Sequence, residues 1–275
     1  MIRNLLITAI TAIALLSVTS CTESDNYNYI EITYNMANRT VNTEGTVASV
    51  TKSKYIVKLD FNTYLASITT TDASIMGFAE TSFSLTDIPF EYTNGGYYFE
   101  IDNVSPTING VVDSSVIFTD VEGHYTSEEY TFYYTIDNSY TTYVTPLTLY
   151  YGYSDVTVTN LYDTTAEAYE TDDITFEVEI DPENNTADLY IWDAQFNEDM
   201  PALDMVFNDL TLKATADGYS ISSISVVPEI DNTPYDDYTA NNLTITLTDT
   251  KADILFYVFS GVFQVQATAN MNDDE

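Results

Sequence analysis

The chain has 275 residues, of which 43 are acidic and 7 are basic, giving a formal net charge of −36. A protein with so much negative charge repels nucleic-acid phosphates and anionic lipid headgroups, so nucleic acid is excluded as a partner and neutral or cationic ligands are favoured. Hydrophobic residues make up 45% of the chain, with 24 tyrosines and 13 phenylalanines. That content argues against disorder and is enough to build a core.

The first predicted element is an export signal. Arg3 precedes an apolar run over residues 5–18, and two small residues come just before Cys21. A basic start, an apolar segment and a small-residue cleavage site are typical of a secretory signal. The run is also shorter than the roughly 20 apolar residues that a membrane span needs. We therefore expect residues 1–21 to form a signal peptide that ends at Cys21.

Cys21 is the only cysteine, so no intramolecular disulfide can form. The four residues 18–21 (VTSC) resemble the lipobox of bacterial lipoproteins. That resemblance implies cleavage before Cys21 and acylation of its thiol and its new N-terminus, which makes Cys21 the lipidation site and the membrane anchor. The alternative is an ordinary free or buried thiol, which is a liability in an exported protein.

Residues 22–29 are predicted to be an acidic tether. Glu23 and Asp25 resemble the surface-export signal of Bacteroidota lipoproteins, although here the two acids are spaced rather than contiguous. The resemblance implies a lipid-anchored protein at the outer membrane or cell surface. A plain solvated tether is the alternative.

The rest of the chain contains an internal repeat. Residues 84–106 align without a gap with residues 206–228 at an offset of 122. Upstream, residues 55–61 align with 174–180 at an offset of 119. We assign the change of offset from 119 to 122 to the turn at 182–185. Earlier still, residues 30–42 align with 148–160 at an offset of 118. Shared glycine positions favour repetition over chance, because glycine placement reflects backbone geometry. We expect two homologous domains, 30–145 and 146–275.

Each repeat is predicted to consist of about eight short antiparallel strands. Apolar residues alternate with polar ones over 174–180, a period of two that is typical of strands with one wet face. Turn residues at 94–96 and 216–218 predict equivalent hairpins. No stretch after the signal predicts a helix, apart from a possible turn at 198–203. The fold class is therefore all-β, with each domain closing into a barrel or folding as a sandwich.

The second repeat carries a recognisable order of elements. A strand ending in an asparagine-rich turn is followed by an aromatic strand (187–196), a strand with Asp before Leu (209–210), a Gly-Tyr return and a closing Phe-Ser-Gly-Val strand (259–262). This order resembles the calycin-like, lipocalin-type domains of Bacteroidota lipoproteins, well over 146–275 and less well over 30–145. The resemblance implies tandem calycin-like barrels and carries no catalytic signature.

Catalytic and metal-binding signatures are absent from the sequence. His124 is the only histidine, no Gly-x-Ser-x-Gly elbow is present, and residues 122–125 predict a loop. One imidazole and one lipidated cysteine do not make a zinc site. The acidic runs lack the spacing of a calcium loop. We expect no catalytic residue, no metal site and no cofactor.

Tyrosine clusters are the remaining candidates for ligand contact. Tyr130, Tyr133 and Tyr134, and the cluster at 150–153, offer aromatic faces with a hydroxyl, which suit sugar rings. The interpretation that we favour, however, is that these tyrosines fill strands and keep one wet end. Trp192, the only tryptophan, is expected in the core.

These features favour a non-catalytic, lipid-anchored cell-surface interaction module. Its partners would be the membrane, through the lipid on Cys21, and a glycan or a host protein as ligand. The alternative is a calycin-like carrier whose barrel holds a small apolar ligand.

Overall fold

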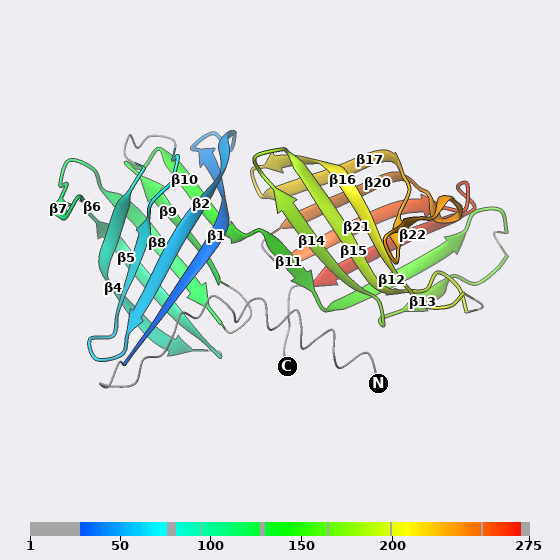
Figure 1. Ribbon diagram of the computed structural model, residues 1–275, viewed down its shortest axis with the longest axis horizontal. Coiled ribbons are helices and arrows are strands. Elements are labelled where there is room, and N and C mark those ends of the chain that lie inside the picture. Colours follow the sequence, from blue (N-terminus) through cyan, green and yellow to red (C-terminus); the bar gives the residue numbers. More distant parts are fainter. Residues whose placement is uncertain are drawn as a thin grey trace. The chain divides into compact units, whose positions relative to one another are not determined.

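The computed structural model describes residues 28–270, except 76–80, 94, 127–129, 164, 199 and 249. The predicted signal peptide, Cys21 and all but the last two residues of the predicted tether lie outside the described residues. The described chain divides into two compact units, 28–43 with 52–146, and 44–51 with 147–270. Both units consist of antiparallel strands, which confirms the all-β prediction (Figure 1).

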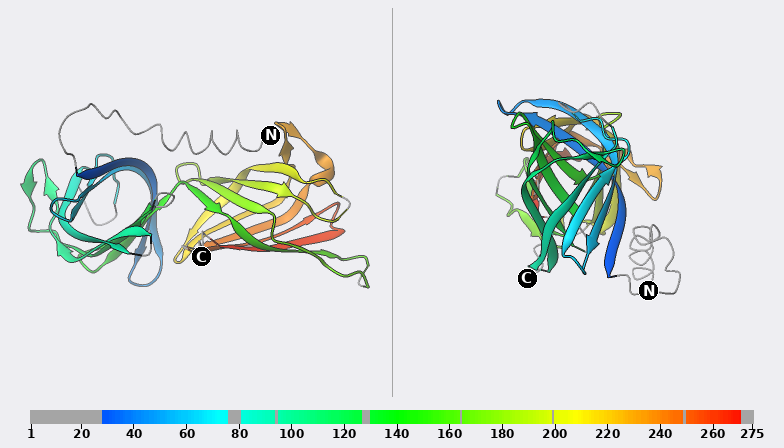
Figure 2. Two further views of the ribbon diagram at one scale, coloured as in Figure 1. Left: turned by 90° about the horizontal axis from the view of Figure 1, so that it is seen from below. Right: turned by 90° about the vertical axis from the view of Figure 1, so that its left-hand side faces the viewer.

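The first unit is a closed up-and-down barrel. Its longer strands are β1 (Tyr29–Asn42), β2 (Val47–Asp60), β3 (Leu65–Thr70), β4 (Phe83–Thr93), β5 (Gly96–Val104), β8 (Phe118–Tyr125), β9 (Tyr130–Ile136) and β10 (Tyr140–Pro146). Each pairs with the next of these strands along the chain, and β10 returns to pair with β1. The left view of Figure 2 shows these strands as a ring. For this unit the structure selects the barrel over the sandwich, because closure leaves no long edge strand unpaired.

A two-stranded hairpin leaves the first barrel at one end. It consists of β6 (Thr107–Ile108) and β7 (Val111–Val112), and β6 pairs with β4 through Ser84 and Thr107. Both valines of β7 are exposed.

The second unit is a barrel-like sheet with the same order of strands. Its strands are β11 (Thr148–Tyr151), β12 (Tyr153–Asn160), β13 (Tyr169–Thr171), β14 (Thr175–Asp181), β15 (Thr186–Ala194), β16 (Leu203–Thr215), β17 (Gly218–Val226), β20 (Ala240–Thr248), β21 (Lys251–Val258) and β22 (Phe263–Asn270). β11 pairs with β14, and β12 pairs with β13 and with β22. The interrupted first strand, β11 followed by β12, therefore pairs at both ends of the sheet.

Strand alternation places the core inside each sheet. In β14, Phe176, Val178 and Ile180 are buried, while Glu177 and Glu179 between them face outward. The interior of the first barrel is filled by large aromatic side chains, including Tyr55, Phe99, Phe118, Phe132 and Tyr134.

The two units share their backbone irregularities at a constant offset of 122. Asp87 in β4 and Asp209 in β16 both have positive φ, 61° and 55°, and each marks a register shift against the preceding strand. Asp120 in β8 and Asn242 in β20 both have φ of 49°. Each lies at a register shift against the following strand, β9 for Asp120 and β21 for Asn242. Such bulges bend a strand and are specific to a fold, so the repeat extends to backbone geometry.

One part of the sequence alignment is corrected by the structure. Leu59 pairs with Ala66, and Ile180 pairs with Ala187, so β2 and β14 correspond at an offset of 121 rather than 119. The turns at 61–64 and 182–185 have the same length. The turn at 182–185 therefore does not account for the change of offset that the sequence analysis assigned to it. A slip of two residues keeps every apolar side chain on the same face, so periodicity alone does not detect it.

Among the described residues the helical element is a single 3-10 turn, η1 (Asp236–Tyr238). It follows a second short hairpin, β18 (Glu229–Ile230) and β19 (Thr233–Pro234), which corresponds to β6 and β7 at an offset of 122. No helix in the described ranges is long and apolar enough to cross a membrane.

Candidate ligand-binding cavity

The tyrosine clusters that the sequence offered for ligand contact do not form a surface. Tyr130 and Tyr134 are buried inside the first barrel, whereas Tyr133 lies on the opposite face of β9 and donates a hydrogen bond to Glu122. Tyr151 is buried and Tyr150 is exposed, because they alternate along β11. Tyr130, Tyr133, Tyr134, Tyr150 and Tyr151 thus alternate between the two faces of their strands, as the favoured strand-filling interpretation expects.

Two other expectations were wrong. Trp192 is only half-buried and stacks on Tyr190, with ring centroids 6.1 Å apart, on the face of β15 opposite to the buried Ile191. His124 lies within strand β8, paired with Tyr98 and Thr131, rather than in a loop.

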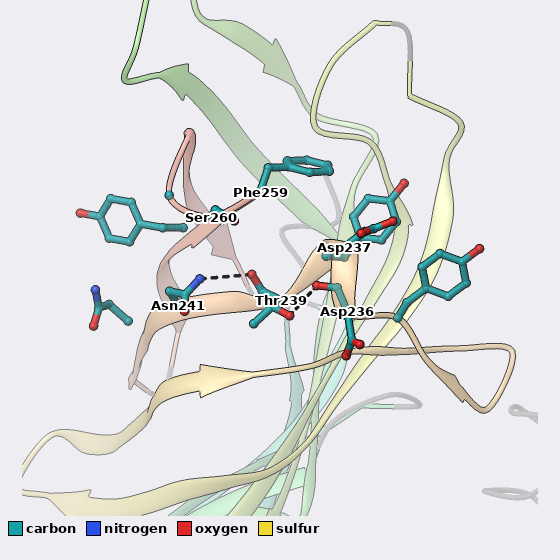
Figure 3. Close-up of a pocket in the computed structure, with 11 residues that line it drawn as sticks. Asp236, Asp237, Thr239, Asn241, Phe259 and Ser260 are labelled. Carbon is teal, nitrogen blue, oxygen red and sulfur yellow. Dashed lines mark hydrogen bonds between the residues drawn. The ribbon is translucent and has the colours of Figure 1, made fainter.

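A cavity of about 1120 Å³ lies at one end of the second unit (Figure 3). It is formed by the connection from β19 through η1 into β20 and by the turn between β21 and β22. The residues that line it are Tyr235, Asp236, Asp237, Tyr238, Thr239, Asn241, Asn242, Tyr257, Phe259, Ser260 and Gly261. None of these residues is cationic.

Backbone hydrogen bonds position the first wall of this cavity. The Tyr235 N–H donates to the Pro228 carbonyl at 2.9 Å, and the Tyr238 N–H donates to the Tyr235 carbonyl at 3.1 Å. The Thr239 hydroxyl donates to the Asp236 carbonyl at 2.6 Å. The 3-10 turn therefore holds two tyrosines together, and its acidic first turn is electrostatically favourable at a helix N-terminus.

The opposite wall is a tight turn in the left-handed region. Phe259 and Ser260 have φ of 52° and 58°, and the Gly261 N–H donates to the Val258 carbonyl at 3.1 Å. A bulky residue at positive φ is strained, and such strain clusters at binding and catalytic sites. Figure 3 shows Phe259 and Ser260 across from Asp236, Thr239 and Asn241.

The aromatic rings form a continuous wall. Tyr235 and Tyr238 have centroids 5.9 Å apart, Tyr238 and Phe259 are 5.3 Å apart at 64°, and Phe259 meets Phe263 at 5.8 Å. Edge-to-face contacts of this kind fix the rings without covering both of their faces.

Polar groups lie beside this aromatic wall. The Asn241 side-chain amide donates to the Thr239 carbonyl at 3.5 Å, and Asn242 is exposed at the bulge. Asp236 and Asp237 are exposed and line the cavity, so their carboxylates are available to accept hydrogen bonds from a ligand. The cavity thus combines aromatic faces, amides, hydroxyls and carboxylates.

The first unit provides an internal comparison. Its equivalent loop begins alike, because the Asp113 N–H donates to the Pro106 carbonyl at 2.8 Å. At an offset of 122, however, the four aromatic lining residues of the second unit correspond to Asp113, Val116, Thr135 and Asp137. The first unit therefore connects the same strands without aromatic side chains at these positions, so closing the sheet does not require them. Its backbone differs in two ways: residues 113–117 form a plain turn where the second unit forms η1, and the turn between β9 and β10 (137–139) is one residue shorter than that between β21 and β22 (259–262).

The sequence analysis missed this site. The tyrosines at 235 and 238 flank two acids, and Phe259 stands where the other repeat has Asp137. Comparing the two repeats position by position would have found both differences. The remaining information is spatial, because the pairing of β20 with β21 brings these two loops together.

Within the described ranges, no group of three or more histidine, cysteine, aspartate or glutamate side chains is placed to hold a metal ion. The predicted absence of a cofactor and of a catalytic residue stays a prediction.

Comparisons with known proteins give limited information. No protein-family model and no curated protein matches the chain. Among solved structures, a double mutant of the vaccine antigen Transferrin Binding Protein B from Haemophilus parasuis Hp5 is similar over 88% of this chain and 76% of its own, at 9% identity and a TM-score of 0.25. Intact Ap-TbpB (N and C lobes) is similar over 91% of this chain and 81% of its own, with the same identity and TM-score. Scores this low carry no argument about function.

Proposed function

We propose that this chain is a non-catalytic, lipid-anchored binding protein of the cell surface, and that the cavity at 235–261 receives its ligand. One observation carries the binding role: the second unit has aromatic residues where the equivalent loops of the first unit have none. Phe259 is kept at positive φ, where Asp137 of the first unit is a residue type that tolerates that conformation. A strained aromatic that the fold does not need is best explained by contact with a ligand.

The chemistry of the cavity supports binding without catalysis. Its titratable carboxylates, Asp236 and Asp237, are adjacent in sequence and exposed. Glycoside hydrolysis needs two carboxylates facing each other across the bond that is cleaved. Acyl transfer needs a nucleophile beside a general base, and neither histidine nor cysteine lines the cavity.

The ligand is proposed to be a glycan or a protein of a host. A carrier of a small apolar molecule is less well supported, because buried aromatic side chains fill the first barrel and Phe176, Phe207 and Phe256 are buried in the second. Mass spectrometry of molecules extracted from the purified protein tests this choice. A stoichiometric apolar molecule would favour the carrier.

The anchor and the location rest on the sequence around Cys21. Metabolic labelling with a fatty-acid analogue should mark the protein, and the Cys21→Ala variant should lose the label. Protease treatment of intact cells should remove the protein if it is exposed at the surface. A variant that stays labelled would contradict anchoring at Cys21, and complete protection from protease would contradict surface exposure.

The binding role is tested without assuming the ligand class. Protein containing 3-fluorotyrosine gives one fluorine NMR signal for each tyrosine, and those of Tyr235, Tyr238 and Tyr257 are assigned from Tyr→Phe variants. Separated fractions of glycans, small molecules and proteins are then titrated in. We expect one fraction to shift these three signals and to leave that of the exposed Tyr92 in the first unit unchanged. If no fraction shifts them, the cavity is not the binding site.

A further inference from the structure

We infer that the ligand of this cavity is a neutral oligosaccharide of at least two sugar units. This inference rests on the proposed binding role of the cavity and adds the ligand class. It follows from the charge of the lining, the arrangement of its rings and the size of the cavity.

Charge excludes anionic ligands. Asp236 and Asp237 line the cavity together with no cationic side chain, in a chain of net charge −36. A sulfated or sialylated glycan, a nucleotide or an anionic headgroup would meet repulsion from the carboxylates and find no cation to pair with. The ligand is therefore neutral or cationic.

The ring arrangement favours a neutral ligand over an ammonium group. A quaternary ammonium group is recognised in an aromatic cage, in which several ring faces surround the cation. Here the Tyr238 ring contacts Tyr235 at 5.9 Å and Phe259 at 5.3 Å between centroids, so the rings form a chain of contacts along a wall rather than a cage. Rings in such mutual contact form a wall, against which the C–H face of a sugar packs.

The polar groups complement sugar hydroxyls, each of which both donates and accepts hydrogen bonds. The two carboxylates accept, while the amides of Asn241 and Asn242 and the hydroxyl of Ser260 do both. Asn241 lies opposite Tyr257 in the β20–β21 pairing, so a second aromatic residue lies beside the amides. The lining therefore offers both polar and apolar groups, as a sugar ring does.

The size of the cavity leaves room for more than one sugar unit. Its volume is about 1120 Å³ and its lining comes from two separate loops, so a chain of sugars can lie along it.

The test uses the mature chain, residues 22–275, and variants copied from the first unit. Tyr238→Val with Phe259→Asp introduces the residues found at 116 and 137, and Asn241→Thr with Asn242→Asp introduces those found at 119 and 120. Because the first unit folds with these residues at the equivalent positions of its sheet, the variants should fold. Tyr92→Ala, which copies Ala214, is the matched control, since it removes an exposed tyrosine from the other unit.

The probes are an array of neutral gluco-, galacto-, manno- and xylo-saccharides of one to six units, sulfated and sialylated glycans, and a polylysine peptide. We expect binding to one neutral series, strengthening from one to two units. The aromatic double variant should weaken it at least about tenfold, or about 1.4 kcal/mol. The amide double variant should weaken it as well, and Tyr92→Ala should bind as the unaltered chain does. Melting curves confirm that each variant is folded.

Three results would overturn the inference. Polylysine binding that depends on Tyr238 and Phe259, without binding of a neutral glycan, would make the ligand cationic and leave the proposed binding role intact. Binding of sulfated or sialylated glycans alone would contradict the charge argument. Absence of binding by every neutral probe would also overturn the inference. The proposed binding role of the cavity would fail only if, in addition, no fraction shifts the tyrosine signals in the fluorine NMR experiment.

Discussion

Four buried polar side chains inside the first barrel, those of Asn38, Ser53, Tyr55 and Tyr134, form a hydrogen-bonded network. The Tyr55 hydroxyl donates to the side-chain amide oxygen (Oδ1) of Asn38 at 2.8 Å and lies 3.3 Å from the Tyr134 hydroxyl. The Asn38 amide in turn donates to Ser53. Burial raises the pKa of Tyr55 because the charged phenolate would be desolvated, so its hydroxyl stays a donor at any ordinary pH. A network of this kind stabilises the fold only while each member has its partner.

Removing one hydroxyl from this network should therefore be costly. We expect Tyr55→Phe to lower the free energy of unfolding by about 1–3 kcal/mol, because the Asn38 oxygen is left buried without that donor. Urea denaturation measures the change. The control is Tyr92→Phe, whose hydroxyl is exposed and whose loss should change stability by less than about 0.5 kcal/mol. Equal effects of the two substitutions would show that the buried network contributes nothing.

Glu177 should make stability depend on pH. Its pKa is raised, first by burial and then by the charge of Glu179, so the ionised form is penalised in the folded state. The penalty is fully present above the folded-state pKa and disappears as pH falls below the unfolded-state value of about 4.3. We expect Glu177→Gln to stabilise the protein at pH 7 by up to about 1 kcal/mol, and not at pH 3.5.

Urea denaturation of both proteins at the two pH values checks this expectation. Glu170→Gln is the control, since that carboxylate is exposed. A stabilisation by Glu177→Gln that is the same at both pH values would mean that ionisation is not its cause.

At the level of elements, the bulges at left-handed residues shape both units. In β16 the Asp209 N–H donates to the Asp188 carboxylate at 2.8 Å, which fixes the bulge against β15. In β4 the equivalent residue is Asp87, again with positive φ. Aspartate and asparagine tolerate this conformation better than branched residues do, which explains why short polar residues occupy these positions.

Replacing the bulge residue should separate conformational strain from charge. We expect Asp209→Val to lower the free energy of unfolding by about 1–2 kcal/mol, because a branched side chain disfavours positive φ. Asp209→Asn removes the charge and keeps the conformational tolerance, so its effect should be small. Thermal and urea unfolding of the two variants measure the difference. Equal losses would mean that the carboxylate, rather than the backbone, matters at this position.

Over the whole molecule, the net charge of −36 opposes compactness. Self-repulsion is screened by salt, so the melting temperature should rise with ionic strength. No acidic loop has the ligand spacing of a calcium site, so sodium, magnesium and calcium chlorides should act alike at matched ionic strength. Calorimetry at several salt concentrations checks this. A saturable rise at sub-millimolar calcium alone would reveal a metal site.

The two units should also fold separately. Strand pairing stays within residues 28–146 in the first sheet and within 147–270 in the second, and Pro146, which pairs with Met36, ends the first sheet. We therefore expect chains covering 28–146 and 147–275 each to unfold cooperatively, as judged by coincident melting curves from circular dichroism and fluorescence. If neither half folds while the whole chain does, the units depend on each other for stability.

The sequence alone was sufficient for the all-β class and for the equivalent hairpins predicted at 94–96 and 216–218, which join β4 to β5 and β16 to β17. Period-two alternation and glycine positions are local consequences of strand and turn geometry, so they are visible without a structure. The antiparallel pairing and the correspondence of the repeats around Asp87 and Asp209 followed from the same local pattern.

Only the tertiary structure decided whether the first sheet closes into a barrel, which side chains face its interior, and where the cavity lies. Closure depends on the pairing of β1 with β10, in which Asn42 lies opposite Tyr140. These residues are separated by most of the unit's sequence, and no local pattern specifies so distant a partner. Which tyrosines are buried depends on register, because neighbouring residues such as Tyr133 and Tyr134 face opposite sides. The cavity forms where two loops distant in sequence meet at the end of a barrel-like sheet, and their proximity is a property of the paired strands rather than of either loop.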